Sequence, residues 1–310
     1  MGIRSESHLE RVLHDQGFAV TAEVVPPRTA DGEAVAVQAR ALRGYADAAN
    51  VTDSPTGAAH MSPVAGAAIV AREGLEPTVQ LTCRDRNRLA ITGDLLGAWA
   101  LGARNVLCLT GDPVAEGARP EIAQVHDLTV LDLVRFVVRL RDEGISLGEQ
   151  AIDPAPRYFV GVADLPLIRG YTPDRLEEKA DAGADFVQTQ IAYDADAMGE
   201  WAEAVRSRGI FERMFVLVGV APPRSARSLR YMRDHLPGVV VPDEVVPRVE
   251  QADDPAAEGV RLTVEVVKRL REIPGVAGVH VIGLGREVPV RRVIAGAGLL
   301  PRPPRPLNLT

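Results

Sequence analysis

Short apolar runs alternate with amphipathic segments along almost the whole 310-residue chain, and this alternation limits the folds open to it. Eight of the runs are rich in β-branched residues, and most follow Gly, Pro or Asp, as expected for buried strands. They occupy residues 18–27, 47–53, 77–83, 105–112, 157–164, 185–193, 213–222 and 278–285. Only 4% of the residues are aromatic, so the core has to be aliphatic, which suits parallel strands covered on both faces.

Between these runs, apolar residues recur at helical spacing and typical boundary residues stand at the ends. In residues 172–183 we expect Thr172 to cap a helix, Pro173 to begin it and Gly183 to end it. Eight strands, each followed by a helix, predict a (β/α)8 TIM barrel, formed as a single domain over residues 1–310 with an irregular Pro/Arg-rich tail from about 301. A doubly wound sheet is the alternative, but no Gly-x-Gly-x-x-Gly phosphate turn follows any of the strands.

Charge and cysteine content argue against several classes of protein. The net charge is −7, and no run of Lys or Arg stands free of acidic neighbours, so we expect no nucleic-acid partner. Cys83 and Cys108 form neither a metal-ligand cluster nor a disulfide framework, and we expect both to be buried thiols. The N-terminal segment has no apolar signal region and no run is long enough to span a bilayer, so we expect a cytoplasmic protein without a membrane partner.

Polar side chains stand near the carboxyl ends of the predicted strands, where barrel enzymes carry their active sites. The first strand contributes Glu23, whose pKa should rise among valines, so that it can act as a general acid. Other strands contribute Asn50, Thr52, Asp53, Gln80, Thr82, Asp112, Gln188, Thr189 and Gln190. Each has a local structural explanation when taken alone, such as a turn cap for Asp112. Together they predict a pocket for a polar aromatic ligand, with one or two carboxylates for proton transfer.

Five segments resemble, in order, the methylenetetrahydrofolate reductase family: FAVTAEVVPPRTAD, ANVTD, VQLTCRDRNR, NVLCLTGD and KADAGADFVQTQIAYD. The match runs from about residue 18 to 300 and is greatest to the short bacterial catalytic subunits, especially the acetogen-like branch. The resemblance implies a barrel that binds a flavin, with FAD expected in preference to FMN, and that reduces 5,10-methylenetetrahydrofolate to 5-methyltetrahydrofolate. It also implies a ping-pong cycle, in which NADH or NADPH reduces the flavin and leaves before the folate binds.

The resemblance also implies roles for individual residues. Glu23 matches the acid that assists opening of the methylene bridge, and Asp112 matches an aspartate that contacts the pterin and tunes the flavin. Gln190 is expected to contact the pterin, with Gln188 on the same face of the strand. The flavin side is expected to include Thr52, Gln80, Thr110, Gly111, Asp112, Arg175 and Lys179, the last two near its phosphate or ribityl end.

The chain departs from the family pattern on the flavin and nicotinamide side. Thr110 replaces the arginine of an Arg-Gly-Asp sequence, Gln80 replaces a histidine, and VADLPLIRGY stands where a YPExHP loop is usual. The electron donor is therefore left open, including a small zinc-containing partner subunit in place of NAD(P)H, and so is assembly into a homo-oligomer. Two rival functions also remain. One is a pterin-binding barrel methyltransferase without redox chemistry, and the other is a non-enzymatic subunit, which the presence of Glu23 and Asp112 disfavours.

Overall fold

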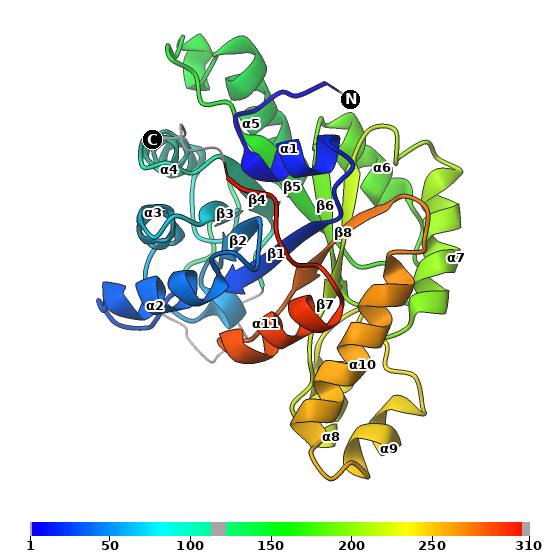
Figure 1. Cartoon of the computed structure of the whole chain (residues 1–310). Helices are drawn as coiled ribbons and strands as arrows, with labels where there is room; N and C mark the ends of the chain where they lie inside the picture. Colours follow the sequence, from blue (N-terminus) through cyan, green and yellow to red (C-terminus); the bar gives the residue numbers. More distant parts are fainter. Residues whose placement is uncertain (1, 113–121, 306–310) are drawn as a thin grey trace.

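Eight parallel strands form a closed barrel in the computed structural model, which describes residues 2–112 and 122–305 (Figure 1). The strands follow one another around the barrel in chain order, and β8 pairs with β1 to close it. Their bounds are β1 Ala19–Val24, β2 Ala48–Val51, β3 Glu76–Thr82, β4 Asn105–Leu109, β5 Phe159–Asp164, β6 Phe186–Ile191, β7 Phe215–Val220 and β8 Val276–Val281. The predicted (β/α)8 fold is confirmed, and the doubly wound sheet is excluded.

Helices surround the barrel and cover its strands (Figure 1). They are α1 His8–His14, α2 Gly32–Leu42, α3 Pro63–Arg72, α4 Arg88–Ala100, α5 Val130–Glu143, α6 Asp174–Asp181, α7 Ala195–Arg206, α8 Ala226–His235, α9 Val245–Glu250, α10 Pro255–Leu270 and α11 Glu287–Gly296. The cap predicted for α6 is wrong by one residue, because Pro173 is the N-cap and the Thr172 hydroxyl donates to the Asp174 carboxylate. Gly183 follows this helix with a φ of 95°, a left-handed conformation that suits glycine at a helix end.

The main core lies between the strands and the inner faces of the helices, and it is aliphatic as predicted. Val20, Val79 and Val160 are among the strand residues buried there. Burial of such a side chain stabilises the fold by roughly 1.5–3 kcal/mol relative to exposure. The strands therefore read as continuous apolar runs, since the residues on both of their faces are covered.

A second apolar cluster fills the amino-terminal end of the barrel interior. Phe159 and Phe186 stack there with their ring centroids 4.8 Å apart, and Leu9 of α1 belongs to the same cluster. Glu76 holds α1 in place, because its buried carboxylate accepts hydrogen bonds from the backbone N–H groups of His8 (2.8 Å) and Leu9 (3.1 Å). This end of the barrel is thus filled, which leaves the carboxyl ends of the strands for a site.

The segment after α11 is irregular from Pro301 to Arg305 and is fixed to the start of the barrel. Arg302 donates a hydrogen bond to Asp47 at 3.1 Å and another to the carbonyl of Phe18 at 2.9 Å. Asp47 also accepts a hydrogen bond from the backbone N–H of Val20 at 2.8 Å. The segment after α11 is therefore tied to the residues that precede β1 and β2.

The two cysteines are buried free thiols, as predicted. Burial raises the pKa of Cys83 to about 11 and also raises the pKa of Cys108. Within residues 2–112 and 122–305, no group of three or more His, Cys, Asp or Glu side chains is placed to hold a metal ion. The same residues include no helix with the length and apolar character needed to cross a membrane.

Candidate functional site

A chain of hydrogen bonds crosses the barrel interior above the apolar cluster. Asn50 of β2 and Gln188 of β6 pair through their amides, with Asn50 Nδ2 donating to Gln188 Oε1 at 2.5 Å. Gln188 Nε2 donates to Thr21 Oγ1 of β1 at 3.0 Å, and that hydroxyl lies 2.9 Å from Nδ1 of His280 on β8. All four side chains are buried, where an unpartnered polar group would be costly. The network therefore fixes the orientation of the His280 ring.

Glu23 stands at the carboxyl end of β1, on the same side of the strand as Thr21. One of its carboxylate oxygens, Oε1, lies 3.9 Å from His280 Nε2, and its side chain is 15% exposed. Because Thr21 Oγ1 accepts from Gln188, its own hydrogen is available for Nδ1 of the imidazole. When Thr21 donates that hydrogen to Nδ1, the ring hydrogen of His280 lies on Nε2 and faces the Glu23 carboxylate.

His280 and Thr21 were not predicted as site residues, although the sequence carried a signal for the histidine. His280 is a lone ionisable residue in the apolar run of the eighth strand, as Glu23 is in the first. An ionisable side chain in an otherwise apolar strand therefore marks His280 as clearly as it marks Glu23. What the sequence does not show is that these two strands become neighbours when the barrel closes.

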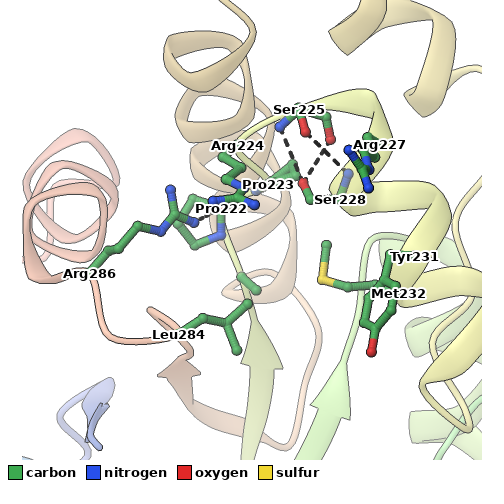
Figure 2. Close-up of a pocket in the computed structure, with 11 residues that line it drawn as sticks. Pro222, Pro223, Arg224, Ser225, Arg227, Ser228, Tyr231, Met232, Leu284 and Arg286 are labelled. Atoms are coloured by element: carbon green, nitrogen blue, oxygen red, sulfur yellow. Dashed lines mark hydrogen bonds between the residues drawn. The ribbon is translucent and has the colours of Figure 1, made fainter.

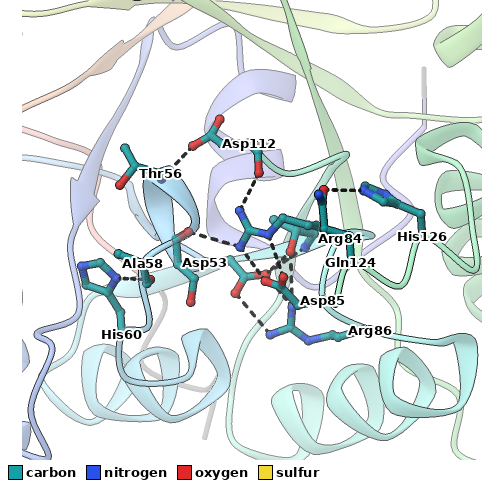
Figure 3. Close-up of polar contacts among 12 residues, drawn as sticks. Asp53, Thr56, Ala58, His60, Arg84, Asp85, Arg86, Asp112, Gln124 and His126 are labelled. Carbon is teal, nitrogen blue, oxygen red and sulfur yellow. Dashed lines mark hydrogen bonds and ion pairs between the residues drawn. The ribbon is translucent and has the colours of Figure 1, made fainter. Parts of the chain in front are cut away.

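Charged residues from three successive loops interlock on the β2–β4 side of the barrel mouth (Figure 3). Asp53, which follows β2, accepts a hydrogen bond from the Thr82 N–H at 2.9 Å and forms an ion pair with Arg86 at 2.6 Å. Asp112, which follows β4, is exposed, and its Oδ2 accepts a hydrogen bond from the Thr56 N–H at 2.9 Å. Asp112 therefore orders a loop at the mouth while its carboxylate stays accessible to a ligand.

The residues assigned to the flavin ring by resemblance lie at neighbouring strand ends. Thr52 follows β2, Gln80 is in β3, and Thr110 and Gly111 follow β4. The hydroxyl of Thr52 is buried and has no hydrogen-bond partner in the described part of the chain, and Gln80 is only partly covered by protein. A buried hydroxyl without a protein partner suits a site that a polar ring completes. This end of the site fits the flavin that the resemblance implies.

The two residues expected near the flavin phosphates are placed less favourably. Lys179 Nζ donates to the carbonyl of Ala163 at 2.6 Å and lies 3.6 Å from the Asp164 carboxylate. Burial lowers the pKa of Lys179 and raises that of Asp164, and Tyr171 donates a further hydrogen bond to Asp164 at 2.8 Å. Arg175 lies on an exposed part of α6. Lys179 is thus engaged in the barrel wall, and its ammonium does not fit an external phosphate in this arrangement.

The two glutamines of β6 occupy different environments, and the register of β6 against β7 shifts between Gln188 and Ile191. Gln188 is 3% exposed, and its amide is fully engaged with Asn50 and Thr21. Gln190, nearer the mouth, donates to the carbonyl of Pro237 at 3.1 Å and accepts from the Ile191 N–H at 2.9 Å. Gln188 thus supports the site from below, whereas Gln190 lies at the level where a ligand would enter.

A cavity of about 730 Å³ opens between the loops after β7 and β8 (Figure 2). Leu284 and Tyr231 form part of its apolar lining and are 59% and 58% exposed. Its lining also includes three arginines, which make no ion pair with any acid in the described part of the chain: Arg224, Arg227 and Arg286. Apolar surface beside unpaired guanidinium groups suits an aromatic ligand that carries negative charge.

A family model described as methylenetetrahydrofolate reductase matches residues 8–298. The chain belongs to the methylenetetrahydrofolate reductase family. Methylenetetrahydrofolate reductase 1 of Schizosaccharomyces pombe is 30% identical over 239 residues, which are 73% of this chain and 36% of that protein. The 5,10-methylenetetrahydrofolate reductase of Pectobacterium carotovorum subsp. carotovorum is 27% identical over 219 residues, which are 69% of this chain and 67% of that protein. The chain thus spans little more than a third of the length of the fungal member of the family.

The barrel of this family member also resembles solved structures. A protein from Clostridium thermocellum, described as uncharacterized and as binding two copies of 5-methyl-5,6,7,8-tetrahydrofolic acid, matches with a TM-score of 0.64 and 13% identity. The match covers 93% of this chain and 97% of that one. At this identity the likeness shows the fold alone, and it agrees with the closed barrel described above.

Proposed function

We propose that this chain is a flavin-dependent methylenetetrahydrofolate reductase, which converts 5,10-methylenetetrahydrofolate to 5-methyltetrahydrofolate with NADH or NADPH as reductant. The observation that carries the proposal is the Glu23 carboxylate, partly buried at the barrel mouth and 3.9 Å from His280 Nε2. An acid in this position, with an oriented imidazole beside it, suits a reaction that needs one proton at a defined atom. Membership of the family and the five ordered motifs support the same reaction.

Glu23 acts first, as the proton donor to N10 of the folate. Protonation lets the bond between N10 and the methylene carbon break with its electron pair on N10, which leaves an iminium carbon bonded to N5. That carbon then accepts a hydride and becomes the methyl group. His280 lies beside this carboxylate with its ring held from behind by Thr21 and Gln188, and Glu23, which is partly exposed, takes its next proton from solvent.

Asp112 and Gln190 position the pterin, and the ends of β2, β3 and β4 hold the flavin ring. Thr52 offers its unpartnered hydroxyl to the ring, and Gln80 offers an amide beside it. When bound, the flavin accepts a hydride from the nicotinamide and passes it to the folate, so that the two substrates use one site in turn. Asp112 adds negative charge beside this site, which the protein tolerates because Thr56 donates to it.

The cavity between the loops after β7 and β8 takes the p-aminobenzoyl-glutamate part of the folate. A p-aminobenzoyl group is aromatic and fits against Leu284 and Tyr231, and the glutamate beyond it is a dicarboxylate. Arg224, Arg227 and Arg286 offer guanidinium groups to those carboxylates without first breaking an ion pair with an acid in the described ranges.

The experiment that tests the function is a visible spectrum of the purified protein, followed by cofactor release and mass analysis. A flavin spectrum that bleaches anaerobically with NADH or NADPH, and recovers with 5,10-methylenetetrahydrofolate to give 5-methyltetrahydrofolate, supports the proposal. The methyltransferase alternative predicts a colourless protein with no flavin bands in its visible spectrum. Bleaching by an artificial donor but by neither nicotinamide would instead favour electron supply from a partner subunit. Gel filtration of the same preparation reports any homo-oligomer.

A further inference from the structure

Arg84 is a charged side chain that is buried at the barrel mouth, directly after β3. Its side chain is 2% exposed, so its charge has to be met by protein groups. It donates to both oxygens of Asp85, through Nε at 2.7 Å and Nη2 at 2.5 Å. It also donates to two backbone carbonyls, that of Asp112 at 2.9 Å and that of Ser54 at 3.2 Å (Figure 3). One guanidinium therefore joins the loops that follow β2, β3 and β4.

The loops joined in this way need such support. Ser54 and Thr56 have φ values of 44° and 57°, in the left-handed region that residues with a Cβ adopt at a cost. Gly111 has a φ of 94°, and a Cβ added there would lie 2.8 Å from the Cβ of Arg84. Arg84 holds Ser54 by its carbonyl, and two residues later the Thr56 N–H meets the Asp112 carboxylate.

Asp112 is consequently held at two points, by its carbonyl through Arg84 and by its carboxylate through Thr56. The fourth strand contributes no guanidinium of its own, because Thr110 stands where the family resemblance leads one to expect arginine. Arg84 brings a guanidinium to the same Gly-Asp pair from the neighbouring loop. The charged turn after β3 and the strand end that carries Thr110 thus meet at the Gly-Asp pair.

We propose that Arg84 is a positioning residue for the folate step, which holds Asp112 in place by tying the loops after β2 and β4 together. The inference rests on the proposed reductase function, since Asp112 is the residue through which Arg84 acts. Loss of Arg84 should therefore impair the reaction of the folate more than the reaction of the nicotinamide, although both use the same flavin.

The chain offers a closely matched control in Arg141. Its side chain is 1% exposed, and it pairs with the next residue, Asp142, at 2.6 Å, as Arg84 pairs with Asp85. It also donates to a backbone carbonyl, that of Tyr158 at 3.3 Å, and pairs with Asp185 at 2.6 Å. These partners lie at the amino-terminal ends of β5 and β6, away from the mouth. Arg84→Lys and Arg141→Lys thus make the same change in two buried arginines, one at the site and one remote from it.

The test measures the two half-reactions separately by anaerobic stopped flow. We expect Arg84→Lys to slow folate reduction at least tenfold, with flavin reduction by NAD(P)H changed less than twofold. The rate of folate reduction should fall further in Arg84→Ala than in Arg84→Lys, and added guanidinium ion should restore part of the rate of Arg84→Ala. Arg141→Lys should lower thermal stability and leave both rates per folded molecule unchanged. Equal losses in both half-reactions of Arg84→Lys, or an unchanged folate rate, would overturn the proposal.

Hydrogen exchange of the Thr56 amide tests the positioning role of Arg84 independently of folate reduction. The Thr56 amide should exchange faster in Arg84→Lys than in the wild type and should be unaffected in Arg141→Lys. Unchanged protection of Thr56 would overturn the positioning role, whatever the activity. Faster exchange in a protein whose wild type reduces no folate would instead remove the reductase function, and with it the step that Arg84 is proposed to serve.

Discussion

Replacement of Thr21 by valine tests the buried network directly, because it exchanges one hydroxyl for a methyl group of similar shape. The change removes the one hydrogen-bond partner that His280 Nδ1 has among residues 2–112 and 122–305. It also removes one acceptor of Gln188 Nε2, which keeps a 3.2 Å bond to Asn50 Oδ1. A buried polar group left without a partner costs about 1–3 kcal/mol. Since Gln188 retains a second acceptor, we expect a loss of about 2 kcal/mol, mainly from His280.

The matched control is Thr78→Val, at a threonine with the opposite hydrogen-bonding situation. Thr78 is as fully buried as Thr21, and it pairs in register with Asn50 on the adjacent strand. Its hydroxyl makes no hydrogen bond to any residue that the structure describes, so a methyl group in its place removes an unsatisfied polar atom. We therefore expect Thr78→Val to leave stability unchanged or to raise it slightly.

The assay is thermal unfolding followed by circular dichroism, with the folate half-reaction measured on the same preparations. A loss of about 2 kcal/mol in a chain of this size corresponds to a fall in Tm of about 3 °C for Thr21→Val. The folate step should also slow in Thr21→Val, because His280 can then carry its hydrogen on either nitrogen, and should be unaffected in Thr78→Val. Equal changes in Tm and in folate rate for Thr21→Val and Thr78→Val would refute the conclusion that the Thr21 hydroxyl stabilises and orients His280.

Glu23→Gln should slow the folate half-reaction by about 10²–10⁴-fold while flavin reduction persists, and equal loss of both would contradict its role as acid. Asp112→Asn should weaken folate reduction with flavin still bound, so unchanged folate kinetics would remove its role. Arg227→Glu should raise the KM for methylenetetrahydrofolate about tenfold, by about 1.4 kcal/mol, but not for an analogue without the glutamate; a rise for both would argue against tail binding. At pH 8 the thiol of Cys83, with its pKa of about 11, should react slowly with a disulfide reagent until the protein unfolds, and Cys108 should behave in the same way. Fast reaction of the folded protein would show that the two thiols are accessible.

The barrel could be predicted from sequence because each strand buries both faces and therefore reads as an apolar run. The runs located all eight strands, although β3 and β8 begin earlier than predicted, at Glu76 and Val276. Helix α1 was not predicted, because it is short and its role depends on Glu76, which lies far along the chain. The cap of α6 was misplaced because Thr172 donates to Asp174 instead of accepting from the helix backbone.

The polar candidates were found individually, but their partners were not. Glu23 was identified as a carboxylate in an apolar strand, yet its neighbour His280 comes from the last strand. Gln188 was expected at the substrate, and it is instead engaged by residues of β1 and β2. The sequence likewise showed a charged turn at Arg84 without showing that the turn reaches Asp112. Local pattern identifies which side chains are unusual, whereas contact between strands distant in sequence requires the closed barrel.

The junction between β1 and β8 has a consequence for how an active molecule is made. Thr21 and His280 meet across it although they are 259 residues apart, and Glu23 meets the same histidine. Contacts between such distant segments form late, because the loop that they close is long. The first strand is synthesised long before the histidine that orients its carboxylate, so a nascent chain cannot hold this pair until the eighth strand has been made. Recovery of folate reduction during refolding should therefore report closure of the barrel, whereas recovery of helical signal should precede it.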